Sequence, residues 1–144
     1  MRIIKFRGKC VPDSKYAGEW VEGGYAPLDE ESTSKNKGEG LIVVFLGGNC
    51  SCSYHVITET VGQFTGLLDK DGKEIYEGDI LALQETDNKV THCPVSMNCK
   101  GYWSIDFGIN YGVCLGLVDK KRVEVIGNIH DNPELLKGGK DEDS

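Results

Sequence analysis

The amino-acid sequence predicts an all-β protein. Nineteen glycines among 144 residues, with 39% hydrophobic residues, fit a chain of short strands joined by tight turns. Short runs of alternating apolar and polar residues recur along the chain, and clusters of Gly, Asp, Asn and Ser separate them. We therefore expect an N-terminal β region over residues 1–58, a small closed β-barrel domain over residues 59–136, and a disordered polar tail over residues 137–144.

The stretch from Glu59 to Ile80 gives the clearest local prediction. Asp69 to Lys73 carries Asp and Gly where a tight reversal needs side-chain hydrogen bonds and a positive φ. Glu77 to Asp79 predicts a second turn, which starts a strand at Ile80. Buried side chains are expected on both sides of these turns: Val61, Phe64, Leu67, Leu68, Ile75, Tyr76 and Ile80. Of these, Phe64, Leu67, Ile75, Tyr76 and Ile80 are expected to form a core that joins the two halves of the chain.

A calcium loop is the alternative for the acidic residues of this stretch. Asp69, Asp71 and Glu74 could be a fragment of such a loop. However, an EF-hand loop needs Gly at its sixth position and Glu at its twelfth, where this chain has Glu74 and Ile80. The register fails, so the hairpin turn is the favoured interpretation.

Three separated motifs resemble the YopX family of phage and prophage proteins. They are Ile4 to Gly8 at the start, Glu59 to Ile80 in the centre, and Glu124 to Ile129 followed by Asn132 to Leu136 near the end. The resemblance implies an SH3-like barrel in the second half of an all-β chain. It implies no established activity and supplies no catalytic residues.

The N-terminal region is expected to contain two pairs of strands. Residues 2–9 alternate, and Glu19 to Tyr25 should return antiparallel to them, with Gly23 and Gly24 as a turn or bulge. Trp20 is interpreted as a core residue rather than a binding aromatic. Residues 28–40 are polar and predict a mobile surface loop. Leu41 to Leu46 predicts a buried strand, Gly47 to Asn49 a hairpin turn, and Cys50 to Ile57 the return strand, with His55 on its surface side.

The second half predicts the five strands of the barrel. Strands are expected from Ile80, over Val90 to Met97 with Pro94 as an edge or bulge residue, and over Tyr102 to Phe107. Asn110 to Leu117 is mixed, and Arg122 to Ile129 predicts the last strand. Asn132 should then cap one helical turn, with Pro133 in its first position.

Charge and hydropathy exclude several classes of function. The net charge of −7 repels phosphate backbones, so nucleic-acid binding is disfavoured, although Lys5, Arg7 and Lys9 lie together in sequence. The longest apolar run, Leu41 to Leu46, is far shorter than the about 20 residues that a membrane helix needs. The first seven residues lack the apolar segment and cleavage site of a secretory signal. We therefore expect the protein in the cytoplasm of a host bacterium, away from membranes.

Six cysteines allow either a metal site or scattered thiols. They are Cys10, Cys50, Cys52, Cys93, Cys99 and Cys114. No pair has the spacing of a zinc knuckle, and the expected cytoplasmic location disfavours disulfides. We expect reduced cysteines, with no metal and no cofactor.

No pattern in the chain predicts catalysis. The sequence has no Gly-x-Ser-x-Gly elbow, phosphate loop or dinucleotide fingerprint. His92 and Cys93 are neighbours on a predicted strand, so they point to opposite faces and cannot pair. The sequence therefore predicts a non-enzymatic protein-binding or assembly module with an unknown protein partner. A nucleic-acid-associated small barrel and a cysteine-ligated metal protein are the alternatives. Self-association through β surfaces is weighed against a monomer whose two β regions cover each other.

Overall fold

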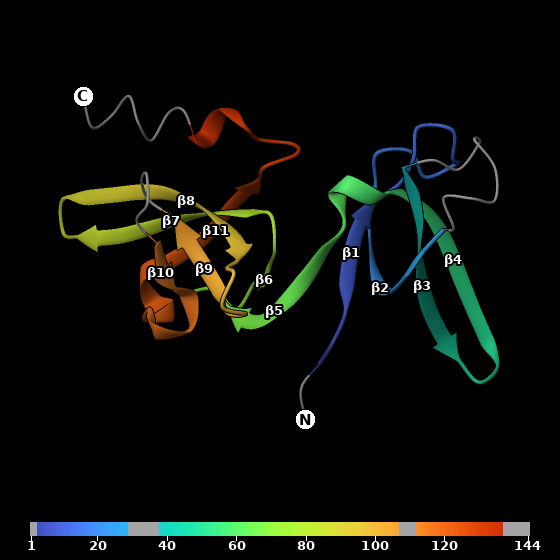
Figure 1. Cartoon of the computed structure of the whole chain (residues 1–144), viewed down its shortest axis with the longest axis horizontal. Helices are drawn as coiled ribbons and strands as arrows, with labels where there is room; N and C mark the ends of the chain where they lie inside the picture. The colour runs from blue at the N-terminus through green and yellow to red at the C-terminus, as the bar shows by residue number, and fades with distance from the viewer. Residues whose placement is uncertain (1–2, 29–37, 107–111, 137–144) are drawn as a thin grey trace. The chain divides into compact units, whose positions relative to one another are not determined.

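The computed structural model describes residues 3–28, 38–106 and 112–136 of the chain. Its regular structure there is almost entirely strand, which confirms the all-β class. The chain divides into two compact units, residues 1–64 and 65–144 (Figure 1). The expected domain boundaries at 58/59 and 136/137 remain a prediction, and the tail from residue 137 lies outside the described residues.

The first unit is an antiparallel sheet with the strand order β4-β3-β2-β1-β5. Its elements are β1 (Phe6–Lys9), β2 (Trp20–Pro27), β3 (Glu39–Gly47), β4 (Cys50–Ile57), the 3-10 turn η2 (Thr58–Thr60) and the start of β5 (Gly62–Leu68). Three side chains form its buried centre: Cys10, Ile42 and Val56. Partly buried residues, mostly aromatic or β-branched, pack around them: Phe6, Val21, Tyr25, Val44, Tyr54 and Val61.

Strand β2 changes its partner at two adjacent glycines. Trp20 to Gly23 pair with β1, and Gly24 to Pro27 pair with β3. A Cβ atom on Gly23 would lie 2.2 Å from the carbonyl oxygen of Val43, so only glycine fits this close approach. The expected turn or bulge at Gly23 and Gly24 is therefore wrong, because both residues lie inside a continuous strand.

Strands β3 and β4 form a hairpin whose far half is exposed. The turn after Gly47 and the bounds of β4 agree with the sequence prediction, and Cys52, Tyr54 and Val56 share the covered face. The prediction of a buried strand over Leu41 to Leu46 is wrong for its second half, since Phe45 is 80% exposed and Leu46 66% exposed. They lie beyond the segment of β3 that β2 covers, so no neighbouring strand on that side shields them.

Trp20 is half-buried rather than a core residue. The guanidinium carbon of Arg7 lies 4.9 Å from the centre of its ring. This cation–π contact keeps one face of the indole in contact with a charged group that also needs water. The core assignment from sequence failed because an indole ring buries well without being fully enclosed.

The second unit contains an antiparallel sheet with the order β10-β9-β8-β7-β11. Its elements are the rest of β5, then β6 (Glu74–Tyr76), β7 (Asp79–Thr86), β8 (Lys89–Met97), β9 (Trp103–Asp106), β10 (Gly112–Cys114), η3 (Leu115–Leu117), η4 (Lys120–Arg122) and β11 (Val123–Asn128). Nine buried residues make up its core: Ile75, Leu81, Leu83, Cys93, Val95, Trp103, Ile105, Leu115 and Val123. Trp103 and Ile105 are buried as expected, but Ser104 between them is buried too, so burial does not alternate along β9, and Phe107 lies outside the described residues.

Pro94 marks the point where β8 changes its partner. Lys89 to Pro94 pair with β7, and Val95 to Met97 pair with β9. Proline lacks an N–H donor, so it fits where a ladder of hydrogen bonds passes from one neighbour to the next. The sequence prediction of an edge or bulge at Pro94 identified the right position, although the strand continues through it.

The central stretch folds largely as expected. Phe64, Ile75, Tyr76 and Ile80 are buried and Leu67 is partly buried, whereas Leu68 is 41% exposed and so does not belong to the core. The turn over Asp69 to Lys73 is closed by the Asp69 N–H donating to the Lys73 carbonyl oxygen at 2.9 Å. Gly72 has φ 81° there, the left-handed conformation that the sequence required of it.

A short turn follows β11 near the end of the described chain. The Leu135 N–H donates to the carbonyl oxygen of Asn132, as one helical turn requires. The capping role expected for the Asn132 side chain is wrong. Its Oδ1 accepts from the N–H of Asn128 at 3.3 Å, so it bonds back to the strand instead of forward into the turn.

Candidate binding cleft

The second unit has an open cleft of about 420 Å³. Its lining comes from four separate segments: Leu83, Glu85, Val113, Leu117, Val118, Asp119 and Arg122. The volume falls within the range of about 300–1,000 Å³ that is usual for ligand sites. A concavity of this size is large enough to hold a side chain or a short peptide.

The apolar part of the cleft is positioned by η3. Leu115 is 3% exposed and anchors this turn in the core, while the Val118 N–H donates to the Leu115 carbonyl oxygen at 3.1 Å. Leu117, 84% exposed, and the buried Leu83 of β7 both line the cleft. An isoleucine- or leucine-sized ligand group could therefore contact both apolar side chains.

Charged groups lie beside this apolar wall. The Arg122 guanidinium donates to the carbonyl oxygen of Glu85 at 3.3 Å. The Glu85 carboxylate accepts from the Thr91 hydroxyl and lies 3.4 Å from the Lys89 ammonium. Asp119 accepts from the Lys121 N–H at 3.0 Å, which caps η4. The rim is thus a set of oriented charges, an arrangement that gives a binding surface its specificity.

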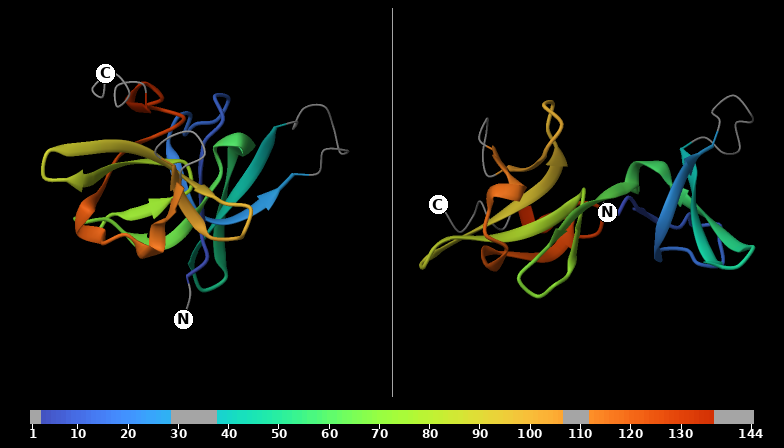
Figure 2. Two further views of the ribbon diagram at one scale, coloured as in Figure 1. Left: turned by 60° about the vertical axis from the view of Figure 1, so that its left-hand side comes forward. Right: turned by 90° about the horizontal axis from the view of Figure 1, so that it is seen from below.

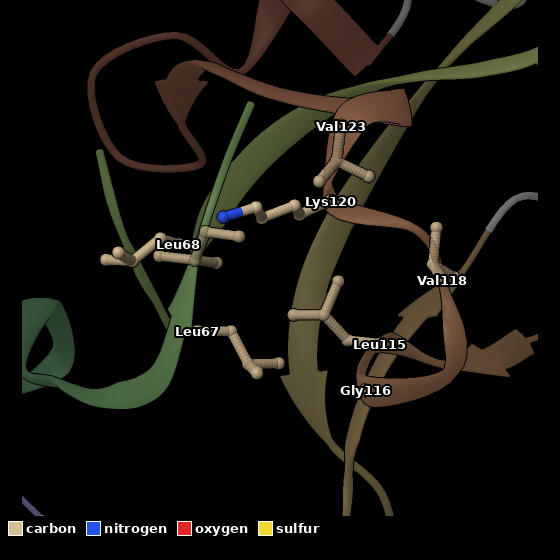
Figure 3. Close-up of a pocket in the computed structure, with 8 residues that line it drawn as sticks. Leu67, Leu68, Leu115, Gly116, Val118, Lys120 and Val123 are labelled. Atoms are coloured by element: carbon tan, nitrogen blue, oxygen red, sulfur yellow. The ribbon is translucent and has the colours of Figure 1, made fainter. Parts of the chain in front are cut away.

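A second, smaller pocket is a packing gap. It has a volume of about 40 Å³ and lies between Leu67, Leu115 and Val123. Figure 3 shows the Lys120 side chain reaching across it toward Leu68. A space of this size holds little more than water molecules, so it is no ligand site.

Asp69 has a structural role, because its carboxylate accepts hydrogen bonds from the backbone. Calcium ligation was the alternative for this residue. Its carboxylate is 2% exposed and accepts three backbone N–H groups, from Asp71 at 2.9 Å, Lys73 at 2.8 Å and Val125 at 3.0 Å. Burial alone would raise the pKa of Asp69, but the N–H donors of Val125, Lys73 and Asp71 together lower it below its usual value. Among the described residues no group of acidic, His or Cys side chains is arranged to hold a metal ion.

The histidines are placed separately. His55 is exposed on β4, as expected, and lies 3.7 Å from the Glu39 carboxylate. His92 Nδ1 is 2.7 Å from the carbonyl oxygen of Leu135, which can only accept, so Nδ1 carries the proton. His130 follows β11, and its backbone N–H donates to the side-chain Oδ1 of Asn128 at 3.0 Å. None of these contacts pairs a histidine with a nucleophile.

The cysteines occupy different environments. Cys10 and Cys93 are buried, Cys52 and Cys114 are partly buried, and Cys50 and Cys99 are exposed. Burial raises the pKa of Cys93 to about 12, with Glu85 and Asp106 adding to the effect. Burial and the charge of Glu19 likewise raise the pKa of Cys10. Both buried thiols are therefore protonated at neutral pH and poor nucleophiles.

The basic residues near the start contact other residues of the first unit. The Lys5 ammonium lies 3.9 Å from the Glu22 carboxylate and 5.1 Å from the centre of the Phe64 ring. The Arg7 guanidinium lies over the Trp20 ring, and the backbone N–H of Lys9 donates to the Thr60 hydroxyl at 2.9 Å. These contacts use the first strand for packing within the unit.

Comparison with known proteins identifies the family. The family described as YopX protein matches residues 6–137. The chain belongs to the YopX family. Among solved structures, protein EF1440 from Enterococcus faecalis is 26% identical with a TM-score of 0.55, covering 94% of this chain and 99% of its own. Protein YopX from Bacillus subtilis is 17% identical with a TM-score of 0.53, covering 94% of this chain and 97% of its own.

No curated protein matches the chain. Membership of the YopX family confirms the resemblance carried by the three motifs, but it assigns no activity to the cleft. In the described part of the chain, no helix is long and apolar enough to cross a membrane.

Sequence reasoning did not identify the cleft. The sequence predicts strands and turns for its lining residues but no shared role, because β7, β10, η3 and η4 are separate in sequence and line one cleft only in the folded unit. One signal was available. Leu117 and Val118 are apolar residues directly before the charged run Asp119 to Arg122, and such a junction often lies at the surface.

Proposed function

We propose that this protein is a non-enzymatic protein-binding or assembly module of phage origin that acts in the cytoplasm of a host bacterium. The cleft beside Leu117 carries the proposal, because it combines an apolar wall with oriented charges. Peptide-recognition grooves use this combination, with apolar contacts for affinity and charges for selection.

An SH3-like barrel for the second unit is part of this proposal. In its five-stranded antiparallel sheet, β7 to β10 are neighbours in sequence order, and β11 pairs with β7 at the other edge. The turn after β5 is bonded to the same strand: the Lys70 N–H donates to the Val123 carbonyl oxygen at 3.0 Å, and Asp69 accepts from Val125. These bonds bring β5 and β6 against β11, which supports a small closed barrel.

Site-specific photo-crosslinking tests the binding function. A photoreactive amino acid is placed at Leu117, at the rim of the cleft, and in a control chain at Met97, which is 41% exposed outside the cleft. Both chains are expressed in lysogenic host cells and irradiated. We expect a covalent protein adduct from position 117 and none from position 97.

Three results would contradict the proposal. Equal adducts at both positions would mean non-specific contact, and no adduct at either would remove the cleft as a protein site. An adduct at 117 that disappears with nuclease treatment would favour nucleic-acid association instead. The milder variant Leu117→Ser should lose a captured partner, whereas Met97→Ser should keep it.

A further inference from the structure

The outer edge of β4 is unpaired along most of its length. β4 is the last strand of its sheet, and β3 pairs with it on the inner side. On the outer side, the described residues that meet it are Cys10, which bridges Val56, and Val11, whose N–H donates to the His55 carbonyl oxygen at 3.1 Å. Along Cys50 to Tyr54, no backbone hydrogen bond joins that side to a described residue, although the Tyr16 ring packs edge-on against the Tyr54 ring with the ring centres 5.2 Å apart. Figure 2 shows this hairpin from two further directions.

The backbone groups on this edge belong to alternate residues. Because the His55 carbonyl points outward to Val11, the backbone groups of Ser53 and Ser51 point outward too. Cys52 and Tyr54 direct theirs inward to Val44 and Ile42 of β3. The edge therefore presents the N–H and C=O groups of two serines, with an open strand on both sides of Cys52.

The hairpin lacks the charges and the proline that usually protect such an edge, and its register shift lies on β3, between Phe45 and Gly47, not on the outer strand β4. Residues 41–54, Leu-Ile-Val-Val-Phe-Leu-Gly-Gly-Asn-Cys-Ser-Cys-Ser-Tyr, contain no charge and no proline, although 27% of the whole chain is charged. Natural sheets commonly protect exposed edges with Lys, Pro, bulges or very short strands. Phe45 and Leu46, 80% and 66% exposed, lie at the same end of the hairpin. This edge is therefore built to accept another strand.

We propose that β4 pairs antiparallel with β4 of a second copy of this chain, about a two-fold axis that passes through Cys52. An antiparallel edge is complementary to itself, so one patch serves both copies. The chain carries a net charge of −7, which opposes most contacts between copies, but this hairpin brings no charges together. The uncharged edge thus selects a second copy over a charged partner.

The position of the axis follows from the length of the open segment. Cys50 to Tyr54 is centred on Cys52, so an axis there pairs Ser51 of each copy with Ser53 of the other and uses the whole segment. The two Cys52 residues then form a non-hydrogen-bonded pair, with Cα atoms about 4.5 Å apart. That separation lies within the range of about 4.4–6.8 Å that a disulfide needs.

Mass measurement on edge variants tests the pairing. Light scattering of the full chain across a micromolar dilution series should give about twice the 15.8 kDa monomer mass at the highest concentrations. Ser53→Pro removes an outward N–H, a change that an edge strand tolerates, and should give the monomer mass throughout. Ser53→Ala keeps that N–H and should remain dimeric. A monomeric wild type, or a dimeric Ser53→Pro protein, would overturn the proposal.

Disulfide crosslinking locates the proposed two-fold axis and does not depend on a proline substitution in β4. Treatment with diamide, which takes up two electrons and two protons as two thiols join, should produce a disulfide-linked dimer on a non-reducing gel. Cys52→Ser should abolish that dimer, and Cys50→Ser should leave it. A crosslink that depends on Cys50 or Cys99 instead would show that the copies meet elsewhere. Because the edge is separate from the cleft, Leu117→Ser should leave both results unchanged, so this proposal can fail independently of the binding function.

Discussion

In each unit of the chain, one long strand changes its partner halfway along its length. β2 passes from β1 to β3 between Gly23 and Gly24, and β8 passes from β7 to β9 between Pro94 and Val95. The first unit makes this change where the two backbones approach too closely for a side chain, and the second makes it at a residue without an N–H. Glycine in one unit and proline in the other thus lie where a strand changes its hydrogen-bonding partner.

The units differ in what surrounds that strand. Among the described residues, the buried cluster of the first unit holds Cys10, Ile42 and Val56, whereas nine residues form the core cluster of the second. The first unit therefore depends more on partly buried aromatic residues at its margin and leaves Phe45 and Leu46 exposed. The difference indicates that a sheet with few buried side chains needs either marginal packing or a partner to cover its strands. Trp20 and Trp103 lie one in each unit, so single-Trp variants can report on the unfolding of each.

The largest effect is expected from the buried Phe64 of the first unit, compared with the exposed Phe45. Phe64 is 7% exposed, and Phe64→Ala should reduce the free energy of unfolding by about 3–5 kcal/mol through the cavity it leaves. Phe45→Ala is the matched control and should change stability by about 0.5 kcal/mol or less, since its ring already faces water. Urea unfolding followed by Trp20 fluorescence measures both. A loss below about 1 kcal/mol for Phe64→Ala would show that the Phe64 ring does not stabilise this unit.

The next effect concerns the buried carboxylate of the second unit. Asp69→Asn replaces a charged acceptor of three N–H groups and should cost about 1.5–3 kcal/mol at neutral pH. Because the pKa of Asp69 is lowered in the folded state, its contribution is present above the unfolded pKa of about 3.9 and is lost as the pH falls through the folded pKa.

Urea unfolding between neutral and acidic pH checks this dependence. The wild type should lose stability on acidification below about pH 4, and Asp69→Asn should lose less in that window. Asp71→Asn, an exposed carboxyl in the same turn, is the control and should follow the wild type. Identical acid limbs for wild type and Asp69→Asn would refute the role given to this carboxylate.

Substitutions at Gly23 and Gly24 test whether the strand needs glycine because of a close backbone contact or because of glycine's flexibility. Gly23→Ala places a Cβ atom 2.2 Å from a backbone oxygen, which cannot move without its strand, so we expect a loss of about 1–3 kcal/mol. Gly24→Ala meets nothing nearer than 3.9 Å and should be close to neutral. Thermal unfolding of the two variants compares them directly. Equal losses would mean that strand flexibility, and not the contact with Val43, requires glycine here.

The smallest effect is expected at the corresponding point of the second unit. Pro94→Ala should cost about 0.4–1 kcal/mol, because alanine fits the strand but gives the unfolded chain more freedom. Unfolding followed by Trp103 fluorescence resolves such a change. A loss as large as that of Gly23→Ala would show that the two partner changes depend equally on their residues and would remove the distinction between the units.

Local features of the fold could be predicted from the sequence, and long-range ones could not. The bounds of β4 and the turn at Asp69 to Lys73 follow from alternation and turn chemistry within a few residues. The exposure of Phe45 did not follow, because an apolar run looks the same whether or not a neighbouring strand covers it. The third acceptor bond of Asp69 joins residues 56 positions apart, and the cleft joins four segments. Neither leaves a local pattern.

The two buried thiols give each unit an internal reporter of its own opening. Cys10 is 2% exposed in the first unit and Cys93 is fully buried in the second. Their raised pKa values slow alkylation further, so an electrophile such as iodoacetamide reaches them only when the surrounding strands separate. Cys50 and Cys99 lie at the surface and are labelled at once. Mass spectrometry of partly labelled protein would thus measure the rate of local opening of both sheets within one sample. The immediate labelling of the surface thiols is the reference for those rates.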